Sequence, residues 1–214
     1  MAWRATVPVN TLPPGHVRPV ASNWIGQGGH FVHYYVRRGE LVNCVGVIER
    51  DTWKAESWSS VGAISEFLND FTDWHEDIQI LVRAAKSCFQ WGLFDRDPMV
   101  RWSEGRVSLL GDACHPMLPF MAQGAVMAIE DAYTLAQCLK ANEEYLPGAL
   151  LRYEALRKKR PAAVQKMSRE NIQFFHHANI QNLEARMSSH RDAHLWLYSF
   201  DVTNQAFDYK GPTK

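Results

Sequence analysis

Apolar residues in the second half of the chain recur at helical spacing. Six of them, at positions i, i+1, i+4, i+7, i+8 and i+11, define one face of a helix over residues 124–140: Ala128, Ile129, Ala132, Leu135, Ala136 and Leu139. The same spacing predicts a helix through residues 146–156 and another through residues 164–172. Pro161 lies between them and should kink or break the helix. A last amphipathic turn is expected over residues 193–200.

The first half of the chain instead has the alternating pattern of strands. Residues 3–9 and 20–25 are expected to be strands, and residues 30–37 and 40–48 should form a hairpin joined by Arg38-Gly39. The glycine cluster at residues 26–29 precedes a strand and therefore predicts a turn. Two short helices are indicated by apolar sets, the first with Val61, Ile64, Leu68 and Phe71 and the second with Ile78, Leu81 and Val82. Further strands are expected at residues 87–94 and 106–111.

This order of elements predicts a fold of the α+β to α/β class, in three parts. Residues 1–104 should form a mixed sheet with a short helical insertion, residues 105–140 a strand, loop and helix, and residues 141–214 a helical region. A dinucleotide-binding domain would begin with a strand, a G-x-G-x-x-G turn and a helix. The sequence contains no such motif.

Composition narrows the range of partners. The 214 residues are 46% hydrophobic and 21% charged with a formal net charge of zero, which argues against a nucleic-acid surface. The basic run at residues 157–160 is interpreted as a solvated helix face. No apolar stretch is as long as a membrane span, so no membrane contact is expected.

Cysteine and histidine spacing gives no sign of a metal centre. The four cysteines, at positions 44, 88, 114 and 138, form no C-x-x-C pair and follow no signal peptide, so we expect reduced thiols in a cytoplasmic protein. His30 and His33 are three positions apart in a predicted strand and should point to opposite faces. We therefore expect no metal site.

The stretch from residue 105 to residue 139 carries the candidate chemistry. A buried strand is expected to end at Gly111-Asp112, which would place a carboxylate at the edge of a sheet where α/β folds bind ligands. After a proline-containing loop, the helix from Gly124 would direct unpaired N–H groups to the same space. The alternative is purely structural, with Asp112 capping a turn and the helix packing its apolar stripe.

This stretch, GRVSLLGDACHPMLPFMAQGAVMAIEDAYTLAQCL, resembles the second flavin-contacting motif of the class A flavoprotein aromatic hydroxylases. It is similar in particular to salicylate and 3-hydroxybenzoate hydroxylases and to 6-hydroxynicotinate monooxygenase. The resemblance implies that Asp112 binds the ribityl chain of FAD. It also implies that Pro119 and the backbone of Gly124, Ala125 and Val126 surround the isoalloxazine ring.

The resemblance extends over nearly the whole chain but covers only the latter half of a complete hydroxylase. It implies a flavin monooxygenase fold that lacks the N-terminal Rossmann half. The segment at residues 91–98 resembles one that these enzymes place just before the Gly-Asp strand. His115 matches a histidine frequent in the family, for which we expect a loop-stabilising hydrogen bond rather than catalysis.

The activity implied by the resemblance is hydroxylation of a small aromatic acid, with FAD, NAD(P)H and oxygen. Such hydroxylation needs a base that removes a phenolic proton, and His30 and Tyr34, on one face of a predicted strand, match a histidine and a tyrosine that relatives use. They are equally well explained as half-exposed strand residues. The alternative for the whole chain is a truncated, non-catalytic remnant unable to hold FAD alone. Its exposed apolar surface would favour self-association or a homodimer.

Overall fold

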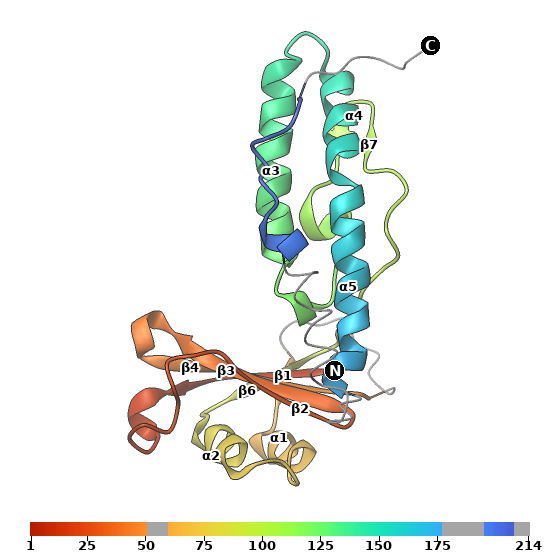
Figure 1. Cartoon of the computed structure of the whole chain (residues 1–214). Coiled ribbons are helices and arrows are strands. Elements are labelled where there is room, and N and C mark those ends of the chain that lie inside the picture. The colour runs from red at the N-terminus through yellow and green to blue at the C-terminus, as the bar shows by residue number, and fades with distance from the viewer. Residues whose placement is uncertain (51–59, 177–194, 208–214) are drawn as a thin grey trace. The chain divides into compact units, whose positions relative to one another are not determined.

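The computed structural model describes residues 1–50, 60–176 and 195–207, and it has a mixed α/β fold (Figure 1). The chain divides into two compact units. The first contains Met1–Leu93 and the end of the last long helix from Gln173 onward. The second contains Phe94–Ile172 and residues 195–207.

The first unit is built on a six-stranded antiparallel sheet with the strand order β2-β3-β4-β1-β6-β5. The strands are β1 Ala2–Pro8, β2 Ser22–Gly26, β3 Gly29–Val36, β4 Leu41–Ile48, β5 Ser60–Gly62 and β6 Cys88–Trp91. Two helices, α1 (Ile64–Asp70) and α2 (Glu76–Ala84), lie against one face of this sheet (Figure 1). Short 3-10 turns at Val9–Thr11 (η1) and Arg37–Gly39 (η2) follow β1 and β3.

Aromatic packing between the sheet and α1 forms the core of this unit. The Trp3 ring of β1 stacks on Phe67 with centroids 5.1 Å apart, and its Nε1 donates to Asp70 at 2.7 Å. Gly46 of β4 allows this packing, because a Cβ there would lie only 2.7 Å from Phe71 and 2.8 Å from Phe67. The strand alternation in the sequence therefore corresponds to a real core face.

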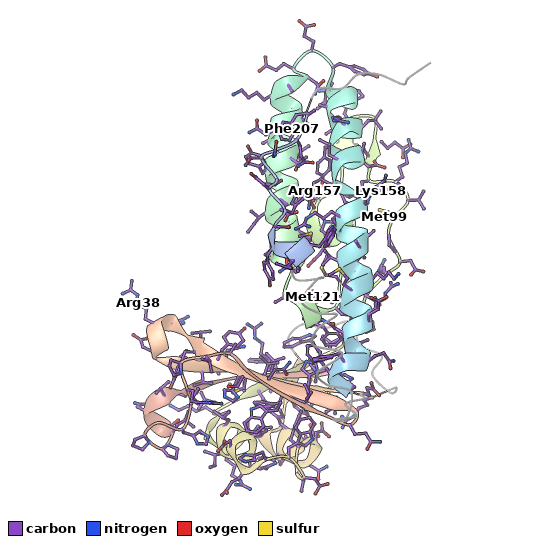
Figure 2. The ribbon with its side chains drawn as sticks, viewed as in Figure 1. Arg38, Met99, Met121, Arg157, Lys158 and Phe207 are labelled. Carbon is purple, nitrogen blue, oxygen red and sulfur yellow. The ribbon has the colours of Figure 1, made fainter. Side chains whose placement is uncertain are left out.

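Most of the expected strands are confirmed, with differences at the ends. The β3–β4 connection is longer than Arg38-Gly39: it is a 3-10 turn in which Arg37, Arg38 and Gly39 all have positive φ, and Arg38 projects from its tip (Figure 2). The prediction that Val61 lies on a helix face is wrong. Val61 belongs to edge strand β5 opposite Phe89 and is 79% exposed, so pairing with β6 outweighs the helical spacing.

The second unit contains three long helices and a short ladder. Its elements are β7 Ser103–Glu104, β8 Val107–Ser108, the 3-10 turns η3 Gly111–Ala113 and η4 Pro119–Met121, and the helices α3 Gly124–Ala141, α4 Leu146–Arg157 and α5 Lys159–His176. The buried strand expected over residues 106–111 is wrong in length and burial. Among the described residues β8 pairs only with β7, Val107 is 67% exposed, and the chain turns at Gly111 with a φ of 62°.

The helix expected over residues 124–140 is confirmed, but the apolar stripe is not its buried face. Ile129 is 69% exposed, and Ala132 and Ala136 are exposed as well. The buried residues of α3 follow a different helical stripe, namely Met127, Glu130, Asp131, Thr134 and Cys138. Charged partners on α4 and α5 explain this choice, because they can satisfy carboxylates that would otherwise be costly to bury.

The expected break near Pro161 is confirmed. Helix α4 ends at Arg157 and α5 begins at Lys159, which places Pro161 in the first turn of α5, where its missing N–H costs little. Residues 195–198 are helical, whereas the start of the turn expected over residues 193–200 lies outside the described residues. None of the helices in the described ranges combines the length and the apolar character needed to cross a bilayer.

Candidate functional site

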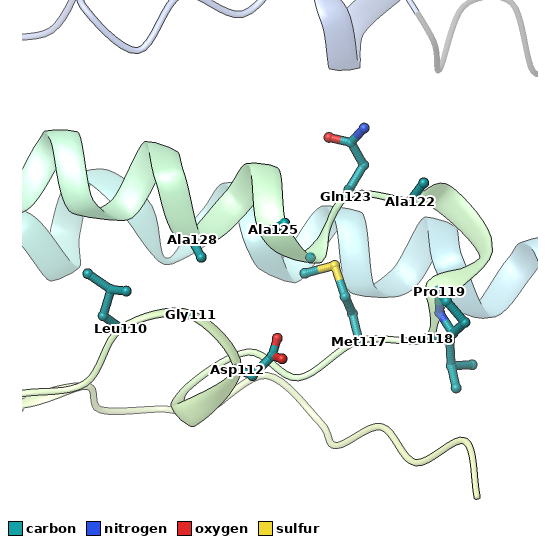
Figure 3. A pocket seen from close by; sticks show the side chains of 11 residues that line it. Leu110, Gly111, Asp112, Met117, Leu118, Pro119, Ala122, Gln123, Ala125 and Ala128 are labelled. Atoms are coloured by element: carbon teal, nitrogen blue, oxygen red, sulfur yellow. The ribbon is translucent and has the colours of Figure 1, made fainter. Parts of the chain in front are cut away.

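A recess of about 540 Å³ lies between the Gly111–Met117 loop and the start of α3 (Figure 3). The Asp112 carboxylate lies on one side of it, and Ala125 and Ala128 of the helix lie on the other. Gly124 also lines the recess. Asp112 is exposed rather than buried against its neighbours. The remaining lining residues are Leu110, Gly111, Met117, Leu118, Pro119, Ala122 and Gln123.

The start of α3 is open at this recess. Its N-cap residue, Gln123, makes no side-chain capping bond, and the first i to i−4 bond of the helix runs from Met127 N to Gln123 O at 2.9 Å. The N–H groups of residues 124–126 therefore precede the helical ladder, where a helix carries partial positive charge. Ala122 turns the chain into the helix with a left-handed φ of 52°.

Gly124 keeps open the space between the helix start and the carboxylate. A Cβ at this position would enter the recess, 3.8 Å from Asp112 Oδ1 and 3.9 Å from Met117 Cγ. It would clash with neither, so the chain does not need glycine here for its own packing. What the absent side chain leaves is space for a flat ligand beside the N–H groups and the carboxylate, and the residues present fit a flavin ring with its ribityl chain.

The loop that carries Asp112 is held by Asp131 of α3. Asp131 Oδ2 accepts from the backbone N–H of Gly111 at 3.1 Å and bonds His115 Nε2 at 2.6 Å. Its other oxygen accepts from Arg157 Nε at 2.7 Å. Because both ends of the Gly111–His115 loop bind one carboxylate oxygen, the loop is fixed to the helix, and the expected structural hydrogen bond of His115 is confirmed.

The ion-pair cluster continues along the same helix face. Glu130 lies 2.8 Å from Arg157 Nη1 and accepts from Arg160 Nε at 2.8 Å, and the Arg160 guanidinium lies 4.0 Å from the Phe200 ring centre. The interpretation of residues 157–160 as a solvated face is therefore wrong for its two arginines. Arg157 is fully buried and Arg160 is 7% exposed. Figure 2 shows Arg157 among the helices of the second unit.

These charges explain how Asp131 stays ionised. Burial alone would raise the pKa of Asp131, but the hydrogen bonds from His115 and Arg157 outweigh burial and bring this pKa below its ordinary value.

Cys114, His115 and Asp131 bring one potential metal-ligand atom each within 4.8 Å of one another. Burial raises the pKa of the Cys114 thiol to about 12, so the thiol stays protonated, and its Sγ donates to Gly111 O. The hydrogen bonds of Cys114, His115 and Asp131 together anchor the Gly111–His115 loop.

The sequence-predicted cofactor residues come together around this recess. Asp112, Pro119, Gly124 and Ala125 line it, whereas Val126 lies in the same helical turn with a side chain 40% exposed and outside the lining. Leu118 and Gln123, with Ala122 and Met117, were not singled out from the sequence. They lie in the loop, where no periodic pattern marks a contact.

The sequence-predicted catalytic residues belong to the first unit. His30 and Tyr34 lie on the face of β3 opposite Phe31 and His33, as expected from strand alternation. His30 is 3% exposed and Tyr34 38%. His33 lies in the aromatic core, where it accepts from Trp24 Nε1 at 3.3 Å.

Known proteins are similar to this chain in sequence and in fold. The family described as FAD binding domain matches residues 79–168. The 3-amino-4-hydroxybenzoate 2-monooxygenase PtnB3 of Streptomyces platensis is 37% identical over 204 residues, and the 3-hydroxybenzoate 6-hydroxylase of Polaromonas naphthalenivorans is 34% identical over 212 residues. These alignments cover 93% and 95% of this chain. The chain belongs to the FAD-dependent aromatic hydroxylase family.

The structure agrees with this assignment. It superposes on a salicylate hydroxylase in a substrate complex with a TM-score of 0.85 and 26% identity, over 99% of this chain and 57% of that protein. Each of the two bacterial relatives is covered over 52% of its length. The chain therefore spans about half the length of the hydroxylases that it matches.

Proposed function

We propose that this chain supplies the flavin-ring side of an FAD-dependent monooxygenase that hydroxylates a small aromatic acid, with NAD(P)H as the reductant. The observation that carries the proposal is the recess in which the Asp112 carboxylate faces the uncapped start of α3. Relatives named 3-hydroxybenzoate 6-hydroxylase and 6-hydroxynicotinate 3-monooxygenase support the substrate class. When bound, FAD supplies hydride acceptance and oxygen activation.

Each side of the recess suits one part of the cofactor. The Asp112 carboxylate can accept hydrogen bonds from ribityl hydroxyls. The N–H groups of Gly124, Ala125 and Val126 can donate to the pyrimidine side of the ring, which is negative in the reduced state. The apolar side chains of Met117 and Leu118, which line the recess, would exclude water from a ring bound there.

We assign substrate deprotonation to His30, with Tyr34 as its partner on β3. A phenol becomes a better nucleophile toward activated oxygen once its proton is removed, and histidine is the usual base for that step. Burial, followed by the electrostatic effect of His176, lowers the pKa of His30 to about 3, so its imidazole is neutral at neutral pH. The exposed apolar face of α3 further supports self-association of the chain.

Riboflavin provides the test, because it contains the ring and ribityl chain but not the ADP part of FAD. If this chain holds only those parts, riboflavin and FAD should quench their fluorescence on it with equal dissociation constants, weaker than about 1 µM. Asp112→Ala should abolish the binding of both. Glu143→Gln, an exposed carboxylate in the same unit, is the matched control and should leave binding unchanged.

Two results would count against the proposal. Binding that is unaffected by Asp112→Ala would place the flavin elsewhere. No binding of either flavin by a well-folded chain would favour the non-catalytic remnant. For activity, NADH oxidation stimulated by 3-hydroxybenzoate or salicylate should be measured on the chain joined to a dinucleotide-binding half.

A further inference from the structure

Three side chains of the first unit form a continuous hydrogen-bonded chain from the sheet to the surface. His30 Nδ1 lies 2.8 Å from His176 Nε2, and His176 Nδ1 lies 2.9 Å from Glu49 Oε1. His30 and His176 are buried, with 3% and 2% of their surface exposed, whereas the Glu49 side chain is 46% exposed. The chain therefore connects a buried imidazole to solvent.

The order of donors in this chain follows from the acceptor at its end. An ionised glutamate can only accept, so His176 donates from Nδ1. When His176 is neutral, its Nε2 is then an acceptor. His30 must then donate from its own Nδ1. The proton of neutral His30 is thereby fixed on Nδ1, and its Nε2 is the nitrogen that carries no proton.

We infer that Glu49 and His176 are positioning residues that fix the tautomer of His30 and conduct the substrate proton to solvent. This inference rests on the proposed role of His30 as the base. When a phenolic O–H bond breaks and a new N–H bond forms at His30 Nε2, the Nδ1 proton of His30 passes to His176 Nε2. The Nδ1 proton of His176 then passes to Glu49, and Glu49 releases it to water.

The surroundings of His30 support transfer rather than storage of the proton. Burial and the neighbouring His176 both oppose a positive charge on His30, which is why its pKa is lowered. Phe175 packs over His30 with ring centroids 4.8 Å apart and keeps this side of the imidazole apolar. An imidazolium at His30 would be unstable there, so the arriving proton must move along the chain.

The tautomers can be tested on the chain itself, without a flavin or a substrate. We expect ¹⁵N-histidine NMR at neutral pH to show both His30 and His176 as neutral Nδ1–H tautomers, with the signals assigned from His30→Asn and His176→Asn. Glu49→Gln should shift His176 toward a mixture of tautomers, and Glu49→Asp should restore the single form. Glu40→Gln, an exposed glutamate in the β3–β4 turn, is the matched control. An Nε2–H form of His176 in the unmodified chain would overturn the inference.

Proton conduction is tested by kinetics on the flavin-loaded protein joined to its dinucleotide-binding half. Glu49→Gln should lower kcat by about tenfold or more, with little change in the KM of the aromatic acid, and should enlarge the solvent deuterium isotope effect. A merely structural role would instead raise KM or lower stability without changing the isotope effect, and would refute the relay.

The two experiments separate this inference from the function on which it rests. Fixed Nδ1–H tautomers together with no oxidation of NADH would leave the hydrogen-bonded chain established and refute the oxygenase. Activity with aromatic acids that is insensitive to Glu49→Gln would support the oxygenase and refute the relay.

Discussion

At the scale of single residues, the carboxylate that matters most for the fold is Asp131, not Asp112. Asp112 is exposed and available to a ligand, whereas Asp131 is fully buried and holds Gly111, His115 and Arg157. The sequence singled out Asp112 as a candidate ligand contact but gave no sign of the anchoring role of Asp131. Burial and hydrogen-bond partners revealed that role.

Asp131→Asn should lower the free energy of unfolding by about 3 kcal/mol, because it removes a carboxylate that pairs with the buried Arg157 and leaves that charge paired with Glu130 alone among the described acidic residues. Glu143→Gln should change it by less than about 0.5 kcal/mol. The measurement is urea unfolding followed by circular dichroism. An equally small effect of both substitutions would mean that the buried ion pair contributes little to stability.

The stability contributed by Asp131 should also depend on pH. Its folded-state pKa is depressed, so the contribution is fully present above the unfolded value near 4 and is lost as pH falls through the lower folded value. Urea midpoints of the unmodified chain should therefore fall more steeply below about pH 4 than those of Asp131→Asn. Parallel curves for the two proteins would contradict this assignment.

At the scale of elements, the site consists of a loop and the start of α3. Hydrogen bonds from the loop to Asp131, a buried residue of α3, hold the two together. The η3 turn needs Gly111, since its φ is 62° and a Cβ would lie 3.2 Å from Ala128 Cβ. The start of α3 needs no such residue for packing. A glycine required by the backbone and a glycine that leaves room for a ligand thus lie thirteen positions apart in one motif.

Gly124→Val should separate binding from folding. The added side chain enters the recess beside Asp112, so riboflavin binding should fall at least tenfold, while the free energy of unfolding should change by less than about 1 kcal/mol. Fluorescence titration and urea unfolding of the same samples measure the two effects. Undiminished binding would show that the ring does not lie at the start of α3.

At the scale of the whole molecule, α3 presents an apolar face without cover among the described residues. Ile129, Val126 and Leu139 are 69%, 40% and 37% exposed on this helix. Exposed apolar helix faces of this kind mark interaction surfaces or drive association. The chain spans about half the length of its relatives, and this face is where we expect copies of the isolated chain to associate.

Ile129→Lys should therefore reduce concentration-dependent self-association, measured by sedimentation velocity. A charge in the middle of the apolar face would have to be desolvated in any contact formed there. Val20→Lys, at a 52% exposed loop position of the other unit, is the control and should leave association unchanged. If both substitutions act equally, net charge rather than this face controls association.

The sequence by itself determined most of the elements and the loop-and-helix motif that lines the recess. Strand alternation in the first unit and helical spacing in the second are local properties, and Gly111, Asp112 and Gly124 lie where a turn, a carboxylate and a helix start were expected. Only the tertiary structure decided which face of α3 is buried, that Arg157 and Arg160 are interior, and that His30 meets His176 and Glu49. Those outcomes depend on partners up to 146 positions away, and no local periodicity encodes the pairing of charges across such a distance.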